Sequence, residues 1–199
     1  LFSTATDFRQ SLPVDEQQLG FANNSDINMV SVDHALSYTR LAGQIADEFL
    51  DKSWDRVAAC SLATEGTACM EKYLRRQLSK IWRKPLEEND VQDLLRIYSI
   101  GAEQDPRAGA RLVFRAMLTA PTFLYRSEIG KTGALSSYEL ASALSYFFWS
   151  TTPDDPLLEK ASNGSLTEDA VLLSEMQRLL EDPRAKRGIS TFADGWIAY

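Results

Sequence analysis

Apolar side chains recur at helical spacing along most of this chain, and that periodicity limits the folds it can adopt. In the first such segment they stand four or five positions apart, at Val32, Leu36, Leu41, Ile45 and Phe49. This spacing places them on one side of an α-helix. No segment alternates apolar and polar residues as a half-buried β-strand does. The sequence therefore predicts an all-α protein, a multi-helix array without a substantial sheet.

Capping residues and prolines indicate where the helices begin and end. Asp105-Pro106 and Asp182-Pro183 each pair an N-cap residue with a proline in the first turn, which is typical of a helix start. Ser136 and Glu139 have the spacing of a capping box, and Asn163-Gly164 is a usual stop. We also expect Thr167 to cap a helix. The expected helices cover about 32–51, 66–82, 88–102, 106–119, 137–150, 154–162, 168–181 and 183–198.

The remaining segments lack helical periodicity. Residues 1–30 carry turn residues and no sustained period, so we expect an irregular lead-in. We expect a loop over 53–65 and a short extended stretch over 123–126. The resulting parts are 1–58 with the first helix, 59–130 as a central helical domain, and 131–199 as the start of a second helical domain.

Charge is unevenly distributed along the chain. Lys and Arg number 21 against 28 Asp and Glu, a net charge of -7, which argues against a nucleic-acid partner. Residues 72–131 nevertheless carry 12 basic and 7 acidic groups, a net of +5. Either this segment complements the acidic ends within the fold, or it forms a patch for an anionic partner. Our candidate partner-binding face is a basic helical stripe of Lys72, Arg76, Lys80 and Arg83.

The chain has few residues that could bind a metal or a haem. Besides Cys60 and Cys69 there is a single histidine, His34, whereas a structural zinc site needs four such ligands. Residues 24–28 resemble the start of a calcium loop, but Met29 and Ala35 stand where an EF-hand needs glycine and glutamate. We expect no metal and no cofactor in this chain. The two cysteines are close enough for a disulfide, and two separate buried thiols fit equally well.

Asp154 and Asp155 are adjacent acids at the start of an expected helix. Paired carboxylates work as acid and base in glycoside hydrolysis, which makes these two the candidate catalytic residues. Adjacent acids at a helix start also serve as N-cap and first-turn charge. We favour the capping interpretation and keep the catalytic one as an alternative.

Several stretches together carry a more specific signal than any single motif. One resembles the signature aromatic-Arg-Arg-Pro-Leu, with Lys84 at the second arginine position, and another resembles Ser-Pro-x-Phe-Leu-Tyr-Arg-x-Glu. In their order along the chain they resemble the large extracytoplasmic multidomain proteins of planctomycetes and some marine bacteria. In those proteins, tandem helical domains of unknown function often follow a cytochrome c-like domain. The stretches are Gly20–Asn24, Ile81–Leu86, Ala120–Glu128, Leu135–Ala141, Leu144–Trp149 and Phe192–Trp196.

The resemblance implies an exported protein, periplasmic or on the cell surface, of which this chain is one part. Members of the group carry cysteines ahead of the Arg-Arg-Pro segment, which favours a disulfide between Cys60 and Cys69. The Cys-x-x-Cys-His motif that attaches haem is absent here, so any haem would belong to an associated domain or partner.

We therefore expect a scaffold or docking module in electron transfer or polysaccharide oxidation. Its partners would be other domains or subunits of an assembly, a cytochrome, or an anionic polysaccharide. One alternative is a glycan-active enzyme domain that uses acidic residues, and another is a purely structural subunit. The longest apolar run is far shorter than the roughly 20 residues of a membrane-spanning helix, so we expect no transmembrane segment.

Overall fold

The computed structural model describes residues 8, 11–14, 30–130 and 133–197. Across these residues it contains helices and no strand, which confirms the all-α prediction. Most of the expected irregular lead-in lies outside the described residues. No helix in the described part of the chain is long and apolar enough to cross a membrane.

The chain forms two compact units, each built from more than one segment. The first unit comprises residues 1–14, 30–82 and 86–124, and the second comprises 15–29, 83–85 and 125–199. The three-part division predicted from the sequence stays a prediction.

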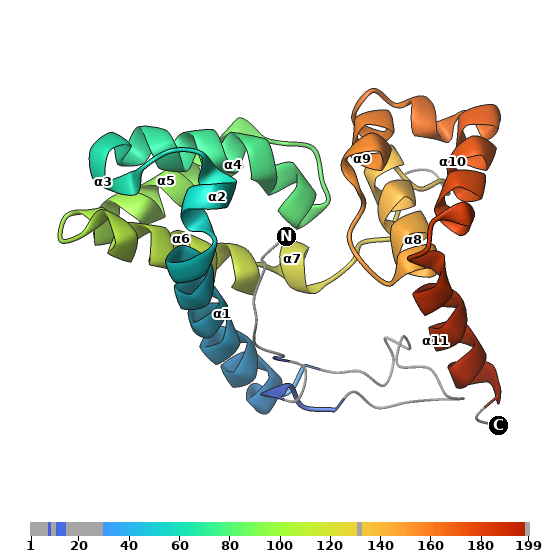
Figure 1. The fold of residues 1–199 in the computed structure, drawn as a ribbon, viewed down its shortest axis with the longest axis horizontal. Helices are drawn as coiled ribbons and strands as arrows, with labels where there is room; N and C mark the ends of the chain where they lie inside the picture. The colour runs from blue at the N-terminus through green and yellow to red at the C-terminus, as the bar shows by residue number, and fades with distance from the viewer. Residues whose placement is uncertain (1–7, 9–10, 15–29, 131–132, 198–199) are drawn as a thin grey trace. The chain divides into compact units, whose positions relative to one another are not determined.

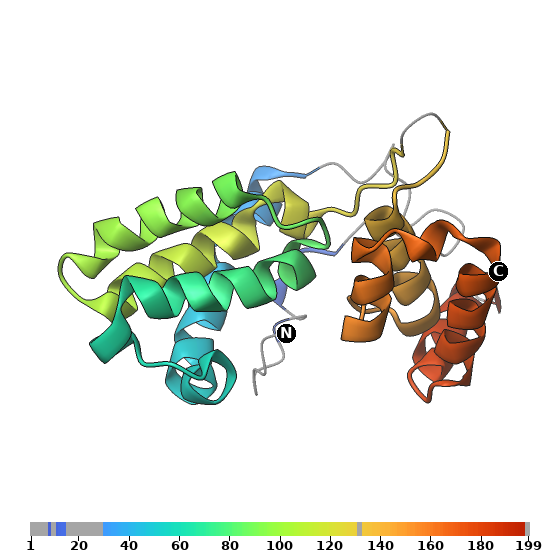
Figure 2. The ribbon, with the colours of Figure 1, turned by 90° about the horizontal axis from the view of Figure 1, so that it is seen from above.

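The first unit contains the long helices expected from periodicity (Figure 1). The helices are α1 (Val32–Lys52), α2 (Trp54–Ala58), α3 (Leu62–Glu65), α4 (Thr67–Trp82), α5 (Glu88–Ala102), α6 (Pro106–Thr119) and α7 (Pro121–Leu124). Helices α4, α5 and α6 lie side by side when seen from above (Figure 2). Each of these three keeps its predicted limits within one residue.

Two predictions for this unit were wrong. The expected loop over 53–65 contains α2 and α3, and the expected extended stretch over 123–126 begins inside α7. These helices have four or five residues each, so they are too short to show a period in the sequence. Helix α2 is held from within the unit instead, because Trp54 and Ala58 are both buried.

A cluster of aromatic rings forms the centre of the first unit. Phe49 of α1 lies 5.0 Å from Phe114 of α6 between ring centroids, and Trp54 lies 5.0 Å from Tyr73 of α4. All four side chains are at most 4% exposed. Aromatic pairs at this separation add to the hydrophobic gain of burial, so α1, α2, α4 and α6 share one core.

Helices α5 and α6 approach each other closely through two glycines. A Cβ added at Gly109 would lie 2.5 Å from the carbonyl oxygen of Tyr98, and one at Gly101 would lie 2.7 Å from the Gly109 nitrogen. Any side chain at these positions would push the helices apart, so both glycines are required by the packing.

The second unit contains the remaining helices and a smaller core. Leu144, Phe148 and Trp149 of α8 pack with residues of the later helices, among them Leu157 and Leu179. Helix α11 crosses α8 at Gly188, where an added Cβ would lie 2.2 Å from the carbonyl oxygen of Phe148. The elements are α8 (Ser137–Trp149), α9 (Asp155–Ser162), the 3-10 helix η2 (Ser165–Thr167), α10 (Asp169–Glu181) and α11 (Ala185–Ile197).

The predicted caps of this unit are partly confirmed. Ser136 and Glu139 form the capping box of α8, and Gly164 follows α9 with a positive φ of 79°. Thr167 is not a cap: it lies in η2, and its hydroxyl donates to the carbonyl of Gly164. Helix α11 begins at Ala185 rather than at Pro183, because Asp182 accepts a hydrogen bond from the Arg184 amide in a preceding turn.

Glu139 also fastens the segment that leads into α8. Its carboxylate accepts hydrogen bonds from the Ser127 hydroxyl at 3.0 Å and from the amides of Ile129 and Gly130 at 3.1 and 3.2 Å. The Ser136 amide and hydroxyl add two more. These donors lower the pKa of Glu139 to about 2, with the Ser136 hydroxyl as the largest cause.

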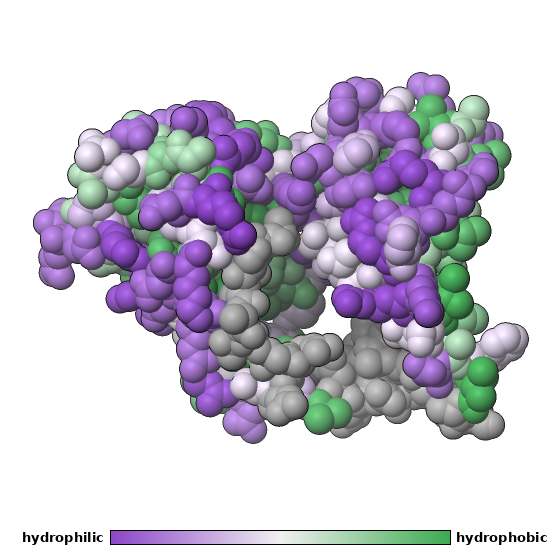
Figure 3. All heavy atoms as spheres, viewed as in Figure 1, coloured by the Kyte–Doolittle hydropathy of each residue, from purple (hydrophilic) through white to green (hydrophobic). Residues whose placement is uncertain are grey.

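Large apolar side chains also gather on the outside of the second unit. Figure 3 shows them in green along α10 and α11, where each is at least 36% exposed. Scattered exposed apolar residues are ordinary, but here seven of them lie on two consecutive helices. We refer to these residues as the apolar band, and it consists of Leu173, Met176, Leu180, Ile189, Phe192, Trp196 and Ile197.

Candidate functional site

A cleft of about 890 Å³ opens in the second unit beside the first turns of α11. Three of its lining residues are cationic and three carry hydroxyl groups. We call it the α11 cleft. Its lining residues are Trp149, Thr151, Pro183, Arg184, Lys186, Arg187, Ser190 and Thr191.

The local fold explains how these residues meet. Trp149 is the last residue of α8, and Ser150 follows in the left-handed region with a φ of 53°, which turns the chain so that Thr151 lies on the cleft. Arg187, Ser190 and Thr191 are three and four positions apart on α11, so they share one face of that helix. The tight crossing at Gly188 fixes α11 against α8, and the exposed face of these three residues borders the cleft.

Arg184 forms one wall of the cleft and is held on three sides. Its guanidinium lies 3.5 Å from the centroid of the Trp149 ring. It pairs with Asp182 at 2.7 Å and with Asp154 at 3.6 Å. The Trp149 ring is itself fixed, because its Nε1 donates to the carbonyl of Leu179 at 2.9 Å. Arg184 is therefore a preorganised and largely neutralised part of the wall.

An ion network lies behind this wall. Arg178 of α10 bonds both oxygens of Asp154, at 2.8 and 3.1 Å, and bonds Glu175 at 2.6 and 2.9 Å. Lys160 of α9 also pairs with Glu175, whose side chain is 1% exposed. We call Asp154, Lys160, Glu175, Arg178 and Arg184 the ion network.

Both carboxylates of the ion network stay ionised at neutral pH. Burial acts to raise the pKa of Asp154, but hydrogen bonds from Arg178 and the Leu157 amide outweigh it, so the pKa is lowered. Burial likewise acts on Glu175, and the hydrogen bonds from Arg178 and Lys160 again lower its pKa. Buried charges of this kind are stable only when they are paired.

The predicted residue Asp154 is therefore a helix cap and a member of the network. Its side chain accepts the Leu157 amide hydrogen bond at 3.2 Å at the start of α9, which confirms the capping interpretation. An ionised carboxylate bound to arginine has no proton to give as a general acid. Asp155 lies exposed in the first turn of the same helix. Their catalytic role stays a prediction.

Lys186 and Arg187 differ from Arg184 in having no counter-ion in the part of the chain that the structure describes. Both are exposed, and neither forms an ion pair with any residue in the described ranges. The sequence interpretation did not single them out. The available signal was the run of cations directly after Asp182-Pro183, but nothing in that run indicates which cation is neutralised.

The basic stripe predicted on α4 is only partly a solvent face. Lys72 is exposed, whereas Arg76 donates to the backbone carbonyls of Val57 and Ala58. Lys80 is half-buried. The neighbouring Arg75 is bound to Glu71 and Glu88, and it lines a shallow cleft of about 550 Å³ together with Lys72.

Arg83 departs furthest from the predicted stripe. It follows α4 with a positive φ of 54°, clusters with the second unit, and is 8% exposed. Its guanidinium donates to the carbonyl of Tyr125 at 3.0 Å and lies 5.9 Å from the centroid of the Tyr146 ring. Arg83 is therefore a buried packing residue, and the stripe does not continue to it. The partner-binding role of the other cations stays a prediction.

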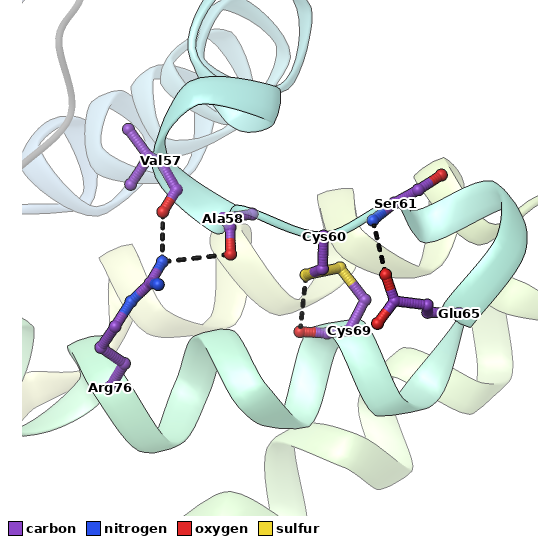
Figure 4. The surroundings of a disulfide bond; sticks show 7 residues. All are labelled: Val57, Ala58, Cys60, Ser61, Glu65, Cys69 and Arg76. Atoms are coloured by element: carbon purple, nitrogen blue, oxygen red, sulfur yellow. Dashed lines mark hydrogen bonds between the residues drawn. A yellow bond between two sulfur atoms is a disulfide. The ribbon is translucent and has the colours of Figure 1, made fainter.

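A disulfide joins Cys60 and Cys69, whose Cα atoms are 5.5 Å apart. The bond implied by the family resemblance is thereby confirmed, and it connects the segment after α2 to α4 (Figure 4). On the two sides of it, Arg76 donates to the Ala58 carbonyl and the Ser61 amide donates to Glu65. In the part of the chain that is described, no group of three His, Cys, Asp or Glu is arranged to hold a metal.

Fold and site together define a disulfide-bonded, all-α protein of two units with a cationic cleft in the second. Three protein-family models match it, each described as a protein of unknown function. PSD3 (DUF1587) matches residues 1–51, PSD5 (DUF1595) matches 69–128, and PSD4 (DUF1592) matches 135–199. The chain therefore carries three tandem domains of unknown function, which supports the resemblance at the level of domains.

Every residue of the α11 cleft lies within the PSD4 match, as does the ion network behind it. No curated protein and no solved structure matches the chain. A role for the cleft is therefore inferred from its lining residues and their contacts alone.

Proposed function

We propose that this chain is a docking module of an extracytoplasmic multidomain protein, and that it holds an anionic partner in the α11 cleft. One observation carries the proposal. Lys186 and Arg187 face a preorganised cleft without a counter-ion among the described residues. An anionic group placed there would receive charge-assisted hydrogen bonds, which are about twice as strong as neutral ones.

The chemistry that the cleft offers is recognition. Its cations donate hydrogen bonds and its hydroxyls both donate and accept them. The nearest predicted catalytic acid, Asp154, has both oxygens bound by Arg178. A docking role uses the groups that are free, whereas a glycan-hydrolysing role would need Asp154 to leave its partners.

The extracytoplasmic location is supported by the disulfide between Cys60 and Cys69. Disulfides persist in oxidising compartments such as the periplasm and the cell surface, and they are rare in the cytosol. The three tandem matches support a place among other domains, in an assembly for electron transfer or polysaccharide oxidation.

A second contact is proposed on α4. Lys72 is exposed and has no ion pair with a described residue. Arg76 and Lys80 lie at helical spacing on the same side. This contact would extend docking to the first unit, without Arg83.

Docking is tested with labelled polyanions of two kinds, poly-glutamate and an anionic polysaccharide, titrated with the 199-residue chain. We expect at least one of them to bind, and K186E/R187E to abolish that binding. Arg56 on α2 and Arg96 on α5 are also exposed and lie outside the cleft, so R56E/R96E reverses the same number of charges and should bind as the parent does. The proposal fails if neither polyanion binds, or if K186E/R187E and R56E/R96E behave alike.

A further inference from the structure

The size of the α11 cleft suits part of an extended polymer. Its volume of about 890 Å³ lies in the upper part of the range of about 300–1,000 Å³ usual for small-molecule sites. A single small anion would occupy only a fraction of this space. The occupant therefore has to supply groups for the rest of the lining as well as a negative charge.

Two of the three hydroxyls of the cleft, those of Ser190 and Thr191, have their protons engaged within α11. Thr191 uses its proton on the carbonyl of Arg187 at 3.0 Å, and the Ser190 hydroxyl lies 3.4 Å from a carboxylate oxygen of Asp194. A hydroxyl has one donor and two acceptor lone pairs, so both retain acceptor capacity toward the cleft. A ligand with O–H groups satisfies them.

The cations of the cleft would bind the anionic groups of the ligand. Lys186 and Arg187 are donors only, and they call for carboxylate or sulfate oxygens. The methylene stems of such side chains and the Pro183 ring also offer apolar surface beside their charges. A sugar residue with an acidic group presents hydroxyls, C–H faces and anionic oxygens together.

An acidic protein fits this lining less well. Protein docking sites are usually centred on a pocket that receives an aromatic or aliphatic anchor. The aromatic residue of this cleft, Trp149, is 1% exposed and is covered by Arg184. It therefore offers no apolar pocket in which such an anchor could be buried.

The fixed wall lowers the cost of binding a weakly held ligand. Arg184 is already ordered by Trp149, Asp154 and Asp182. Less side-chain entropy is lost when a ligand settles against a wall that is ordered in advance.

From these observations we infer that the ligand of the α11 cleft is a polysaccharide bearing carboxylate or sulfate groups. This inference rests on the proposed docking function and names the partner of that same site. The anionic groups bind Lys186 and Arg187, and neighbouring sugar hydroxyls donate to Ser190 and Thr191.

The test compares four labelled polymers at about 50 mM salt, where electrostatic contacts are only moderately screened. They are polygalacturonate, dextran sulfate, neutral dextran and poly-glutamate. We expect at least one anionic polysaccharide to bind and neutral dextran not to bind. Polygalacturonate and dextran sulfate distinguish carboxylate from sulfate as the recognised group.

Two variants separate charge from hydroxyl recognition. K186Q/R187Q should weaken binding of the anionic polysaccharide at least about tenfold, as expected for the loss of charge-assisted hydrogen bonds. S190A/T191V keeps every cation and should weaken polysaccharide binding about threefold while leaving poly-glutamate unchanged. Circular dichroism verifies that both variants keep the helical content of the parent.

The outcomes show separately whether the polysaccharide inference fails and whether the proposed docking function fails. Tighter binding of poly-glutamate than of either anionic polysaccharide would overturn the inference and leave the docking function standing. Equal binding by S190A/T191V and the parent would also overturn it, since charge alone would then explain the affinity. If no polymer binds, both proposals fail.

Discussion

The two units differ in how many polar side chains they bury and in where their exposed apolar side chains lie. Among the described residues, the first unit buries one polar side chain, Ser53. The second unit buries Arg83, Ser142, Ser145 and Glu175, and it exposes the apolar band. The first unit therefore depends mainly on hydrophobic packing and a covalent link, and the second depends to a larger extent on paired charges.

In the second unit, charged and hydroxyl side chains occupy part of the interior that apolar side chains fill in the first unit. The ion network fixes Arg184 beside the cleft, but each buried charge must offset a desolvation cost. The aromatic cluster of the first unit contains no charged group, and its desolvation cost is confined to polar atoms such as Trp54 Nε1, which is buried without a hydrogen-bond partner among the described residues. The following predictions would break or sharpen the contrast.

The largest effect is expected in the core of the first unit. Phe114 is fully buried and touches three other rings. Phe114→Ala should lower the free energy of unfolding by about 3–5 kcal/mol, because it leaves a cavity. Urea unfolding measures it, with Val32→Ala as the control, since Val32 is 76% exposed. An effect below about 1 kcal/mol would contradict the proposed dependence on packing.

Removal of the disulfide should come next. C60S/C69S frees a loop of about ten residues, and chain entropy predicts a loss of about 2–3 kcal/mol. The loss should appear in the first unit alone, as faster amide exchange in peptides from α2 to α4. Equal loss of protection in α8 to α11 would show that the units are not energetically separate.

Breaking the ion network should have an intermediate effect. Arg178→Met leaves Asp154 and Glu175 without their shared partner, so we expect a loss of about 1–2 kcal/mol. A fully buried pair would cost more, but the Arg178 side chain is 35% exposed and is screened by solvent. Arg178→Lys should restore part of the loss. Unchanged exchange of α9 and α10 amides in Arg178→Met would refute the network's role.

Acidification should affect the second unit more than the first. The pKa values of Asp154, Glu175 and Glu139 are lowered in the folded state. Their contribution is therefore complete above the ordinary pKa of about 4 and is lost as the pH falls through the folded values. In the first unit, Glu88 also has a lowered pKa, of about 2, but its partner Arg75 is exposed, and exposed pairs add little.

Amide exchange between pH 6 and 3 measures this difference. Peptides from α8 to α10 should lose protection at a higher pH than peptides from α4 to α6. D154N/E175Q should flatten the dependence in the second unit only. Simultaneous loss in both units at one pH would contradict the prediction.

The smallest effect is expected on the apolar band. Trp196 is 70% exposed on α11, so Trp196→Gln should change the unfolding free energy by less than about 0.5 kcal/mol. The same change should improve solubility, measured as the concentration at which the protein begins to scatter light. A loss above about 1 kcal/mol would show that the band is packed in solution.

The sequence predicted those parts of the fold that depend on local rules. The capping box at Ser136 and the stop at Gly164 came from neighbouring residues, and so did the cap made by Asp154. Helix α3 could not be predicted this way, because four residues span about one turn and show no period.

The candidate site was largely invisible in the sequence. The α11 cleft brings Thr151 together with residues more than 30 positions later, and this depends on how α11 crosses α8. Which cations are neutralised also depends on tertiary structure, since Arg178 of α10 pairs with Asp154, the N-cap residue of α9. Helical spacing wrongly placed Arg83 on the basic stripe, because its left-handed backbone takes its side chain off the predicted face of α4.

The position of Arg83 has a consequence for how the protein can be divided. The second unit includes 83–85, and the Arg83 guanidinium donates to Tyr125 within that unit. The PSD4 match begins only at 135. A boundary drawn by sequence similarity therefore cuts through a physical unit. Residues 135–199 expressed alone would lack both the guanidinium and its acceptor, so the segment matched by sequence and the compact unit seen in the structure have different limits.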